Sequence, residues 1–470
     1  MKVALAHDFL IKWGGAEKVL FDLHKIFPKA PIYTLFYNKK FTDEYFQGVE
    51  IKSSYLQKRY HLLTLRQSSG QGGVGGIRGI KGRGKMDGMH RWLLPWMPLA
   101  TESMDFSDYD LVVSSSSAFL KGIIVPTKTK HICYVHTPTR WAWQDRPLAV
   151  LLKNADINVE QTLSVNQRGY QRRSAIKKIL MAVSGISFMN LIKRLYVHLY
   201  RLWDFDAAQR PDMLMANSKY TARRIEKYYK RKAEVVYPGV EIFNKFPISN
   251  DQCHSEVVSS DRRIPAYNTN HEILPSAGRG QDDKTKKLYQ MPFEKYFVVV
   301  SRLSAYKKID LIIEAFKDLP FNLVVVGDGK EIKNLKFKVK SLGLEDRVFF
   351  TGFIKDKAII AKLIKNSIAL IHLTEEDFGI SMAEALALGT PVIGLEKGGA
   401  KEIIKKRHNG ELIGGKNNKE IIGNLKNAVK KLALNEKKYI INIGKEDNGI
   451  FSGEKFTKAI VNLAKTTINT

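Results

Sequence analysis

The 470-residue chain is poor in cysteine and contains no long apolar run. Its two cysteines, Cys133 and Cys253, are too few for a disulfide framework or a cysteine-based metal cluster. The longest apolar stretch, residues 179–192, is too short and too interrupted to cross a bilayer of about 30 Å. The sequence opens directly on a strand-like run, residues 2–9, with no signal peptide before it. These features predict a cytoplasmic protein rather than a disulfide-stapled secreted domain.

Acidic residues are scarce relative to basic ones. The chain has 76 Lys and Arg against 47 Asp and Glu, which gives a formal net charge of +29. This surplus indicates anionic partners, and nucleic acid, anionic lipid and phosphorylated small molecules all satisfy it. A lysine-rich surface without any partner explains the same composition, so the charge alone does not select a ligand.

The alternation of short β-branched runs with helix-like segments is typical of parallel sheets with crossover helices. The chain is longer than one hydrophobic core usually spans, so we expect more than one domain. In the first half, the apolar face of residues 16–27 predicts a helix ended by Pro28, and Ser218 is the expected N-cap of a later helix. Strands are expected at these apolar runs: 3–8, 110–115, 131–136, 213–218, 234–240, 296–303, 321–329, 347–353, 368–374 and 390–396.

We therefore predict an α/β protein with two doubly wound domains, residues 1–240 and 293–450. Residues 241–292 are polar and aperiodic, and we expect an irregular linker there. Residues 451–470 contain a short helix that could pack back onto the amino-terminal domain. The insert at 68–88 mixes glycine and arginine as RNA-binding tails do, but a flexible loop is the favoured interpretation.

The stretch EEDFGISMAEALALGTPVIG, residues 375–394, predicts a turn and a helix between two strands. The helix would end at Gly389 as its C-terminal cap, and Pro391 prevents it from continuing. Such a turn at the carboxyl end of a parallel strand is where open α/β sheets bind ligands. The helix start offers free backbone N–H groups and a partial positive charge, which suit a phosphate, at Phe378, Gly379 and Ile380.

Two glutamates flank this predicted phosphate site. Glu384 lies about one turn into the helix, roughly 6 Å along its axis, where a carboxylate could accept hydrogen bonds from a ribose diol. Glu376 lies on the other side, where a sugar would sit. The spacing can therefore straddle one nucleotide-sugar. A capping acid followed by an ordinary helix glutamate explains the same spacing equally well.

Arg302 and Lys307 lie beyond the carboxyl end of the strand expected at FVVV, residues 297–300. An arginine can fork onto two phosphate oxygens and a lysine adds a point charge, so together they could neutralise a diphosphate leaving group. Taken alone, such residues after a strand are more often solvated.

Four motifs in the second half resemble the donor-binding half of glycosyltransferase family 4, the group 1 glycosyltransferases with the GT-B fold: SRLSAYKK, VVVGDG, FFTGF and EEDFGISMAEALALGTPVIG. The E-x7-E signature of the family falls on Glu376 and Glu384, and its R-x4-K pair falls on Arg302 and Lys307. VVVGDG alone would indicate only a generic nucleotide fold, because the third glycine of the dinucleotide fingerprint is missing.

The first half carries the resemblance further. HDFLIKWGGAEKV is similar to the first loop of the family, in which Gly14 and Gly15 would let backbone N–H groups approach the diphosphate. YVHTPTRWAW is similar to the stretch with the active-site histidine of the family, here His136. Several segments resemble the bacterial subgroup that includes O-antigen and exopolysaccharide mannosyltransferases. The resemblance lapses at 68–88 and over much of 241–292.

The resemblance implies a GT-B protein, in which two Rossmann-like domains face each other across a cleft that binds the donor. It implies transfer of a hexose, with mannose favoured, from a nucleotide-sugar to a glycan or polyprenyl-linked acceptor, with retention at the anomeric carbon. His136, Arg302, Lys307 and Glu376 would be the catalytic residues. No cofactor and no metal are expected beyond the donor itself, GDP-mannose in preference to a UDP-sugar. No Asp-x-Asp stands at the end of an expected strand to hold a divalent ion.

Three alternatives stay open at this point. A different GT-B enzyme, such as a nucleotide-sugar epimerase, would share the same motifs. The interpretation as a nucleic-acid-binding protein rests only on the charge and the Gly/Arg stretch, and we expect no nucleic acid partner. Residues 174–203 combine apolar and basic residues and could form an interfacial helix at the inner membrane face, although a packed core helix is favoured.

Overall fold

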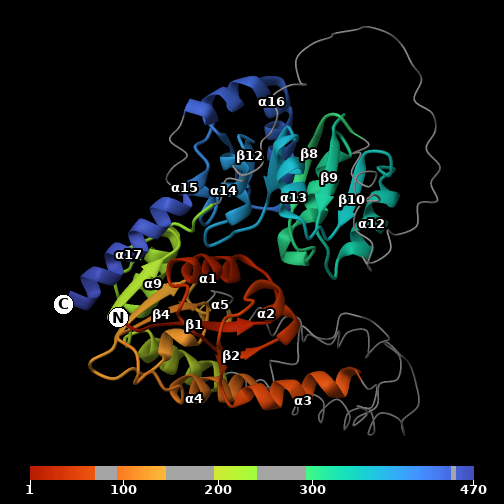
Figure 1. Ribbon diagram of the computed structural model, residues 1–470. Helices are drawn as coiled ribbons and strands as arrows, with labels where there is room; N and C mark the ends of the chain where they lie inside the picture. Colours follow the sequence, from red (N-terminus) through yellow and green to blue (C-terminus); the bar gives the residue numbers. More distant parts are fainter. Residues whose placement is uncertain (69–92, 144–194, 241–292, 446–450, 470) are drawn as a thin grey trace, which may run out of the picture.

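The structure is a computed structural model that describes residues 1–68, 93–143, 195–240, 293–445 and 451–469. The expectations for the linker at 241–292 and for nearly all of the insert at 68–88 lie outside the described residues. The described chain forms two α/β units, one above the other in Figure 1.

The amino-terminal sheet has seven parallel strands in the order β3-β2-β1-β4-β5-β6-β7. The runs of apolar residues buried in this sheet explain why most of its strands were predicted, whereas β2 and β3 were missed. Its strands are β1 (Val3–Leu10), β2 (Ile32–Tyr37), β3 (Ile51–Ser53), β4 (Leu111–Ser116), β5 (Lys130–Val135), β6 (Met213–Ala216) and β7 (Glu234–Val235).

The carboxyl-terminal sheet has six parallel strands in the order β10-β9-β8-β11-β12-β13. Separate apolar cores cover its two faces, which defines a doubly wound sheet. Its strands are β8 (Tyr296–Val300), β9 (Asn322–Val326), β10 (Val348–Gly352), β11 (Ala369–His372), β12 (Val392–Leu395) and β13 (Gly410–Ile413).

Helices cover both faces of the amino-terminal sheet as well, so two doubly wound α/β domains are confirmed. The side chain of Ser218 accepts a hydrogen bond from the backbone N–H of Thr221, which confirms it as an N-cap. In the first domain the helices are α1 (Gly15–Ile26), α2 (Lys39–Tyr45), α3 (Leu56–Ser68), α4 (Met97–Glu102), α5 (Arg140–Trp143), a helix over residues 195–207, and α9 (Lys219–Tyr229). In the second they are α11 (Ile309–Phe316), α12 (Ile332–Ser341), α13 (Lys357–Lys365), α14 (Ile380–Ala387), α15 (Ala400–Ile403) and α16 (Asn418–Lys445).

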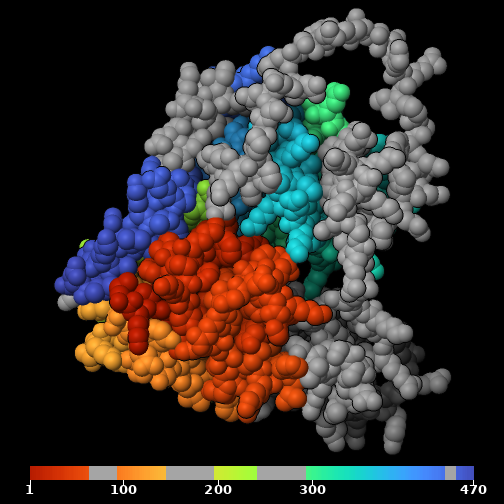
Figure 2. Space-filling view, viewed as in Figure 1, coloured from red at the N-terminus to blue at the C-terminus, as the bar shows by residue number. Residues whose placement is uncertain are grey.

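The last helix, α17 (Gly453–Asn469), lies against the amino-terminal domain although it follows the carboxyl-terminal one. Phe456, Ile460 and Ala464 are buried in the core that α1 and β5 also line. Figure 2 shows this helix, in blue, beside the red and orange surface of the first domain. Its apolar residues recur every three to four positions, and that spacing gives the helix one buried face.

Candidate active site

Two helix starts meet at the boundary between the domains. Helix α1 follows β1 with Gly14 as its N-cap, and α14 follows β11 with Gly379 as its N-cap. A Cβ at Gly15 would lie only 3.0 Å from Ile380 Cδ1, so the two helix starts are in contact. Each start presents backbone N–H groups and the positive end of a helix dipole, an arrangement that favours anions.

Gly379 and Phe378 contribute backbone rather than side chain to this region. Gly379 has φ +101°, a left-handed conformation that glycine adopts without strain. The Phe378 side chain is buried and its ring packs near those of Tyr237 and Phe451. Any contact of Phe378 with a ligand must therefore come from its backbone.

Glu384 has a partner that the sequence did not indicate. Lys18 Nζ, from α1 of the other domain, donates a hydrogen bond to Glu384 Oε1 at 2.9 Å. The only available signal was that Lys18 follows Gly14 and Gly15 by about one helical turn. The carboxylate predicted to bind ribose thus lies at the domain boundary, beside a lysine that a phosphate could also attract.

The structure brings Glu376 and Lys307 together. Lys307 Nζ contacts Glu376 Oε1, His372 Nε2 lies 3.7 Å from the same oxygen, and Arg140 Nη2 lies 3.7 Å from Glu376 Oε2. Burial opposes ionisation of Glu376, but His372 and Lys307 outweigh it and hold the pKa of this carboxyl well below its usual range. Glu376 is therefore ionised and can only accept hydrogen bonds.

Arg302 is not part of this contact network. It follows β8, as predicted, but its side chain is exposed, and no described residue forms an ion pair with its guanidinium. An exposed guanidinium of this kind is a fork-shaped cation that an incoming anion can reach.

His136 lies at the end of β5 and belongs to a chain of polar contacts. Its Nε2 is 2.8 Å from Ser115 Oγ, which is in turn 3.2 Å from His7 Nδ1, and His7 Nε2 is 3.7 Å from Glu17 Oε1. The parallel register that places His7 beside Ser115 brings these residues together. Burial, with a smaller contribution from His7, lowers the pKa of His136 to about 3. The ring is thus neutral at pH 7 and can both donate and accept hydrogen bonds.

Gly398 and Gly399 support the turn that carries Glu376. Gly399 N–H donates to the Glu376 carbonyl at 2.9 Å, and Gly398 has φ +63°. A Cβ at Gly398 would lie 2.2 Å from the Glu376 carbonyl oxygen, a main-chain atom that cannot rotate away. The turn therefore requires glycine at this position.

We expect Gly398→Ala to lower the free energy of unfolding of the carboxyl-terminal domain by more than the cost of the left-handed backbone conformation alone. The left-handed conformation costs alanine about 1–2 kcal/mol, and crowding typically adds about 1–3 kcal/mol. Gly343→Ala is the matched control, because Gly343 has φ +64° and no atom within 4 Å of the added Cβ. Denaturant unfolding of both variants measures the difference. Equal losses would contradict close packing of Gly398 against the Glu376 turn.

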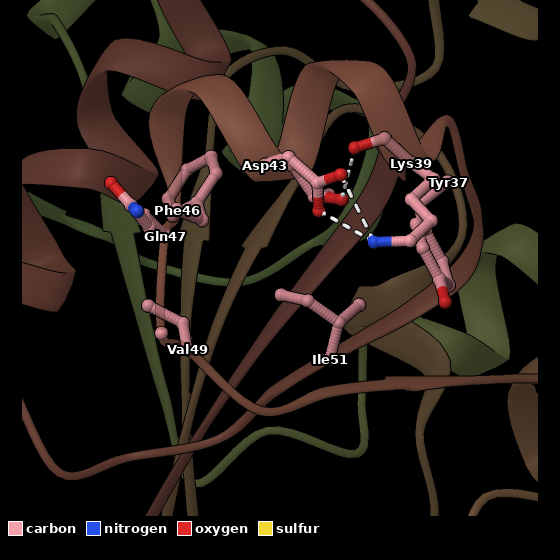
Figure 3. Close-up of a pocket in the computed structure, with 9 residues that line it drawn as sticks. Tyr37, Lys39, Asp43, Phe46, Gln47, Val49 and Ile51 are labelled. Atoms are coloured by element: carbon pink, nitrogen blue, oxygen red, sulfur yellow. Dashed lines mark hydrogen bonds and ion pairs between the residues drawn. The ribbon is translucent and has the colours of Figure 1, made fainter.

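A surface hollow of about 390 Å³ lies elsewhere on the amino-terminal domain, between α2 and β3. Figure 3 shows Asp43 and Lys39 at its rim, joined by an ion pair of 2.9 Å. None of the predicted site residues lines it. Among the described residues, no group of three or more His, Cys, Asp or Glu side chains is placed to hold a metal ion. Nor does any described helix have the length and apolarity needed to cross a membrane.

Comparison with known proteins agrees with this architecture. Residues 281–447 match the family described as Glycosyl transferases group 1. N-acetyl-alpha-D-glucosaminyl L-malate synthase of Bacillus anthracis is 32% identical over 123 residues, which are 25% of this chain and 32% of that protein. Alpha-1,3/1,6-mannosyltransferase ALG2 of Dictyostelium discoideum is 24% identical over 305 residues, 59% of this chain and 66% of that protein. The alignments thus cover less than two thirds of either relative.

Among solved structures, Anabaena Alr3699/HepE in complex with UDP-glucose superposes with a TM-score of 0.58 at 17% identity. The superposition covers 99% of this chain and 100% of that one. It confirms the GT-B fold that the sequence predicted. The family match concerns residues 281–447 of the carboxyl-terminal unit, and the superposition concerns the fold of the whole chain.

Proposed function

We propose that this protein is a retaining hexosyltransferase that transfers a sugar from a nucleotide-sugar to a glycan or polyprenyl-linked acceptor, in the synthesis of surface polysaccharide. The observation that carries the proposal is the meeting of the α1 and α14 starts beside the Lys307–Glu376 pair. A nucleotide-sugar needs these features: N–H groups for its diphosphate, cations for the leaving charge, and an ionised carboxylate for sugar hydroxyls.

In this mechanism Arg302 and Lys307 stabilise the charge that develops on the departing diphosphate, without a metal ion. Glu376 accepts hydrogen bonds from the hexose, and the neutral His136 orients it. No side chain is assigned as nucleophile, because the leaving phosphate can take the proton of the acceptor on the same face of the sugar. This front-face route retains the anomeric configuration.

For the donor we favour GDP-mannose over UDP-sugars. The motifs of the mannosyltransferase-like subgroup support GDP-mannose, as does similarity to a protein described as a mannosyltransferase. The structural neighbour solved with UDP-glucose keeps UDP-sugars as the second choice. A thermal shift panel of nucleotide-sugars separates them, since a ligand at 100 times its Kd adds about 2.7 kcal/mol of stability.

Product analysis tests the reaction itself. A transferase forms free nucleoside diphosphate only when an acceptor is present, whereas an epimerase returns an isomerised nucleotide-sugar. Salt-dependent binding of random oligonucleotides without any nucleotide-sugar binding would instead favour the nucleic-acid alternative.

We expect Glu384→Ala to weaken donor binding about tenfold or more, because a hydrogen bond to a charged group is worth about 1.5–3 kcal/mol. Titration calorimetry with the nucleoside diphosphate measures the loss. Glu345→Ala is the control. Glu345 is exposed and lies just before β10, at the amino ends of the strands, whereas the candidate site lies at their carboxyl ends. Unchanged affinity in Glu384→Ala would show that its carboxylate does not hold the ribose.

We further propose a cytoplasmic enzyme that contacts the inner membrane face peripherally. The helix at 195–207 supports this contact, because Leu195, Leu199 and Leu202 share one face and are 57%, 54% and 53% exposed. An exposed apolar face on a chain of charge +29 suits an anionic interface. Co-sedimentation with vesicles that contain anionic lipid, against neutral vesicles, tests it.

A further inference from the structure

Side chains of the amino-terminal domain form hydrogen bonds and ion pairs with the acidic turn of the carboxyl-terminal domain, residues 375–377. Asp377 Oδ2 accepts a hydrogen bond from Arg140 Nε at 2.9 Å and is also in contact with Arg140 Nη2. Asp377 Oδ1 contacts Arg224 Nη1, and Ser218 Oγ donates to the Asp377 carbonyl at 2.6 Å. One carboxylate of the carboxyl-terminal domain thus bridges two arginines of its neighbour.

Arg224 is held in place within its own domain. Arg224 Nη1 also donates to Thr137 Oγ1 at 2.9 Å, and two residues further on Thr139 Oγ1 donates to the buried Asp204 at 2.9 Å. Asp377 is only 7% exposed and Arg224 12%. Water therefore screens the Arg224–Asp377 attraction little, whereas Arg140 is 36% exposed and also lies near Glu376. Removing the Asp377 carboxylate would leave Arg224 as a partly buried cation without its ion-pair partner.

Further hydrogen bonds between the two domains lie next to these ion pairs. Tyr220 OH donates to Glu375 Oε1 at 2.7 Å. In the opposite direction, Glu402 of the carboxyl-terminal domain accepts hydrogen bonds from the backbone N–H groups of Lys219 and Tyr220, at 2.8 and 2.6 Å. The start of α9 therefore contacts both the acidic turn, through Tyr220 and Glu375, and α15, through Glu402.

Glu376 lies in the middle of the acidic turn, between Glu375 and Asp377. Its carbonyl accepts a hydrogen bond from Gly399 N–H of its own domain. The residues that follow lead directly into the α14 start at Ile380. The position of the carboxylate assigned to the sugar, and of the N–H groups assigned to the phosphate, thus depends on contacts made from both domains.

We propose that Asp377 is a positioning residue, which uses Arg140 and Arg224 of the amino-terminal domain to fix Glu376 and the start of α14. The inference rests on the proposed function for its catalytic consequence. Its structural consequence, an ordered turn, does not depend on that function. Asp377 itself is not assigned any contact with substrate.

The test uses the full chain with Asp377→Asn, Arg224→Gln and Arg224→Lys. Glu44→Gln is the control, because Glu44 pairs with Lys355 at 2.7 Å in another ion pair between the domains, one that is exposed and does not contact the turn. Two readouts are measured: amide hydrogen exchange of residues 375–381 without ligand, and kcat and KM for the donor. Circular dichroism and the unfolding midpoint verify that each variant is folded.

We expect Asp377→Asn and Arg224→Gln to speed exchange in 375–381 and to lower kcat/KM about 10- to 100-fold, the range expected for losing a charge-assisted hydrogen bond. Arg224→Lys should recover part of both effects because it keeps the charge. Glu44→Gln should change neither.

Unchanged exchange in the two folded variants would overturn the proposal. An equal effect of Glu44→Gln would also overturn it, since domain association in general would then be responsible. If the wild-type chain shows no transfer with any donor, the proposed function fails, while the exchange measurement still decides the role of Asp377.

Discussion

We expect Arg302→Ala and Lys307→Ala to lower turnover about 100- to 1,000-fold, with little change in donor affinity. Both cations are assigned to the diphosphate, whose negative charge grows only as the sugar departs, and such interactions raise kcat rather than affinity. Arg302→Lys should fall between wild type and Arg302→Ala, because it keeps the charge and loses the fork. The assay is turnover of purified protein in excess chelator with its own donor and acceptor.

The exposed Lys317, at the end of α11 and away from the site, gives a matched control in Lys317→Ala. Full activity in both alanine variants would contradict charge stabilisation by this pair. Loss of wild-type activity on chelation would contradict the metal-free mechanism.

The structure also distinguishes the two alanine variants by their pH dependence. Lys307 helps to hold the pKa of Glu376 below its usual range against the effect of burial. Without Lys307 that pKa should rise, so more of Glu376 is protonated as the pH falls, and Lys307→Ala should lose further activity toward acid pH. Arg302 has no contact with Glu376, so Arg302→Ala should keep the wild-type profile. Identical pH–rate profiles for the two variants would contradict the pairing.

The second large effect is expected on stability, from Asp204→Ala. Asp204 is fully buried, and its carboxylate lies 2.6 Å from the equally buried Lys121 Nζ. It also accepts hydrogen bonds from Trp143 Nε1 at 2.6 Å and Tyr229 OH at 2.8 Å. Removing one partner of a buried ion pair leaves the other charge buried without compensation, which typically lowers the free energy of unfolding by about 3–5 kcal/mol.

The free energy of unfolding of the amino-terminal domain, measured by denaturant titration, checks this expectation. Asp43→Ala is the control, because Asp43 and Lys39 form an exposed pair one helical turn apart, worth at most about 0.5 kcal/mol. Replacing both buried charges, with Lys121→Met and Asp204→Leu together, should recover part of the loss, since no uncompensated charge remains. A small loss for Asp204→Ala would show that the site relaxes or admits water.

Much of the fold could be predicted from local patterns. The short apolar runs of the second half became β8 to β12, and the glycine at 389 has φ +81° after α14, as expected for a helix terminator. The strands missed were β2, β3 and β13. Of these, β3 has only three residues, none of them buried, and β13 begins with glycine and contains Glu411, whose burial depends on Lys431 and Tyr439 far along the chain. Short or polar strands lack the periodic signal on which such predictions depend.

The sequence alone determined the order of ten of the thirteen strands and the placement of Glu376 and Glu384 on either side of a helix start. Helix geometry fixes such spacings over a few residues, so they can be read directly from the chain. Only the tertiary structure decided the partners of these residues: Lys18 for Glu384, Lys307 for Glu376, and Arg140 and Arg224 for Asp377. These partners are 69 to 366 positions apart in the chain. No local periodicity encodes contacts at such separations. The Lys307–Glu376 contact arises when β8 and β11 pair within one sheet, and the others arise when the two domains pack against each other.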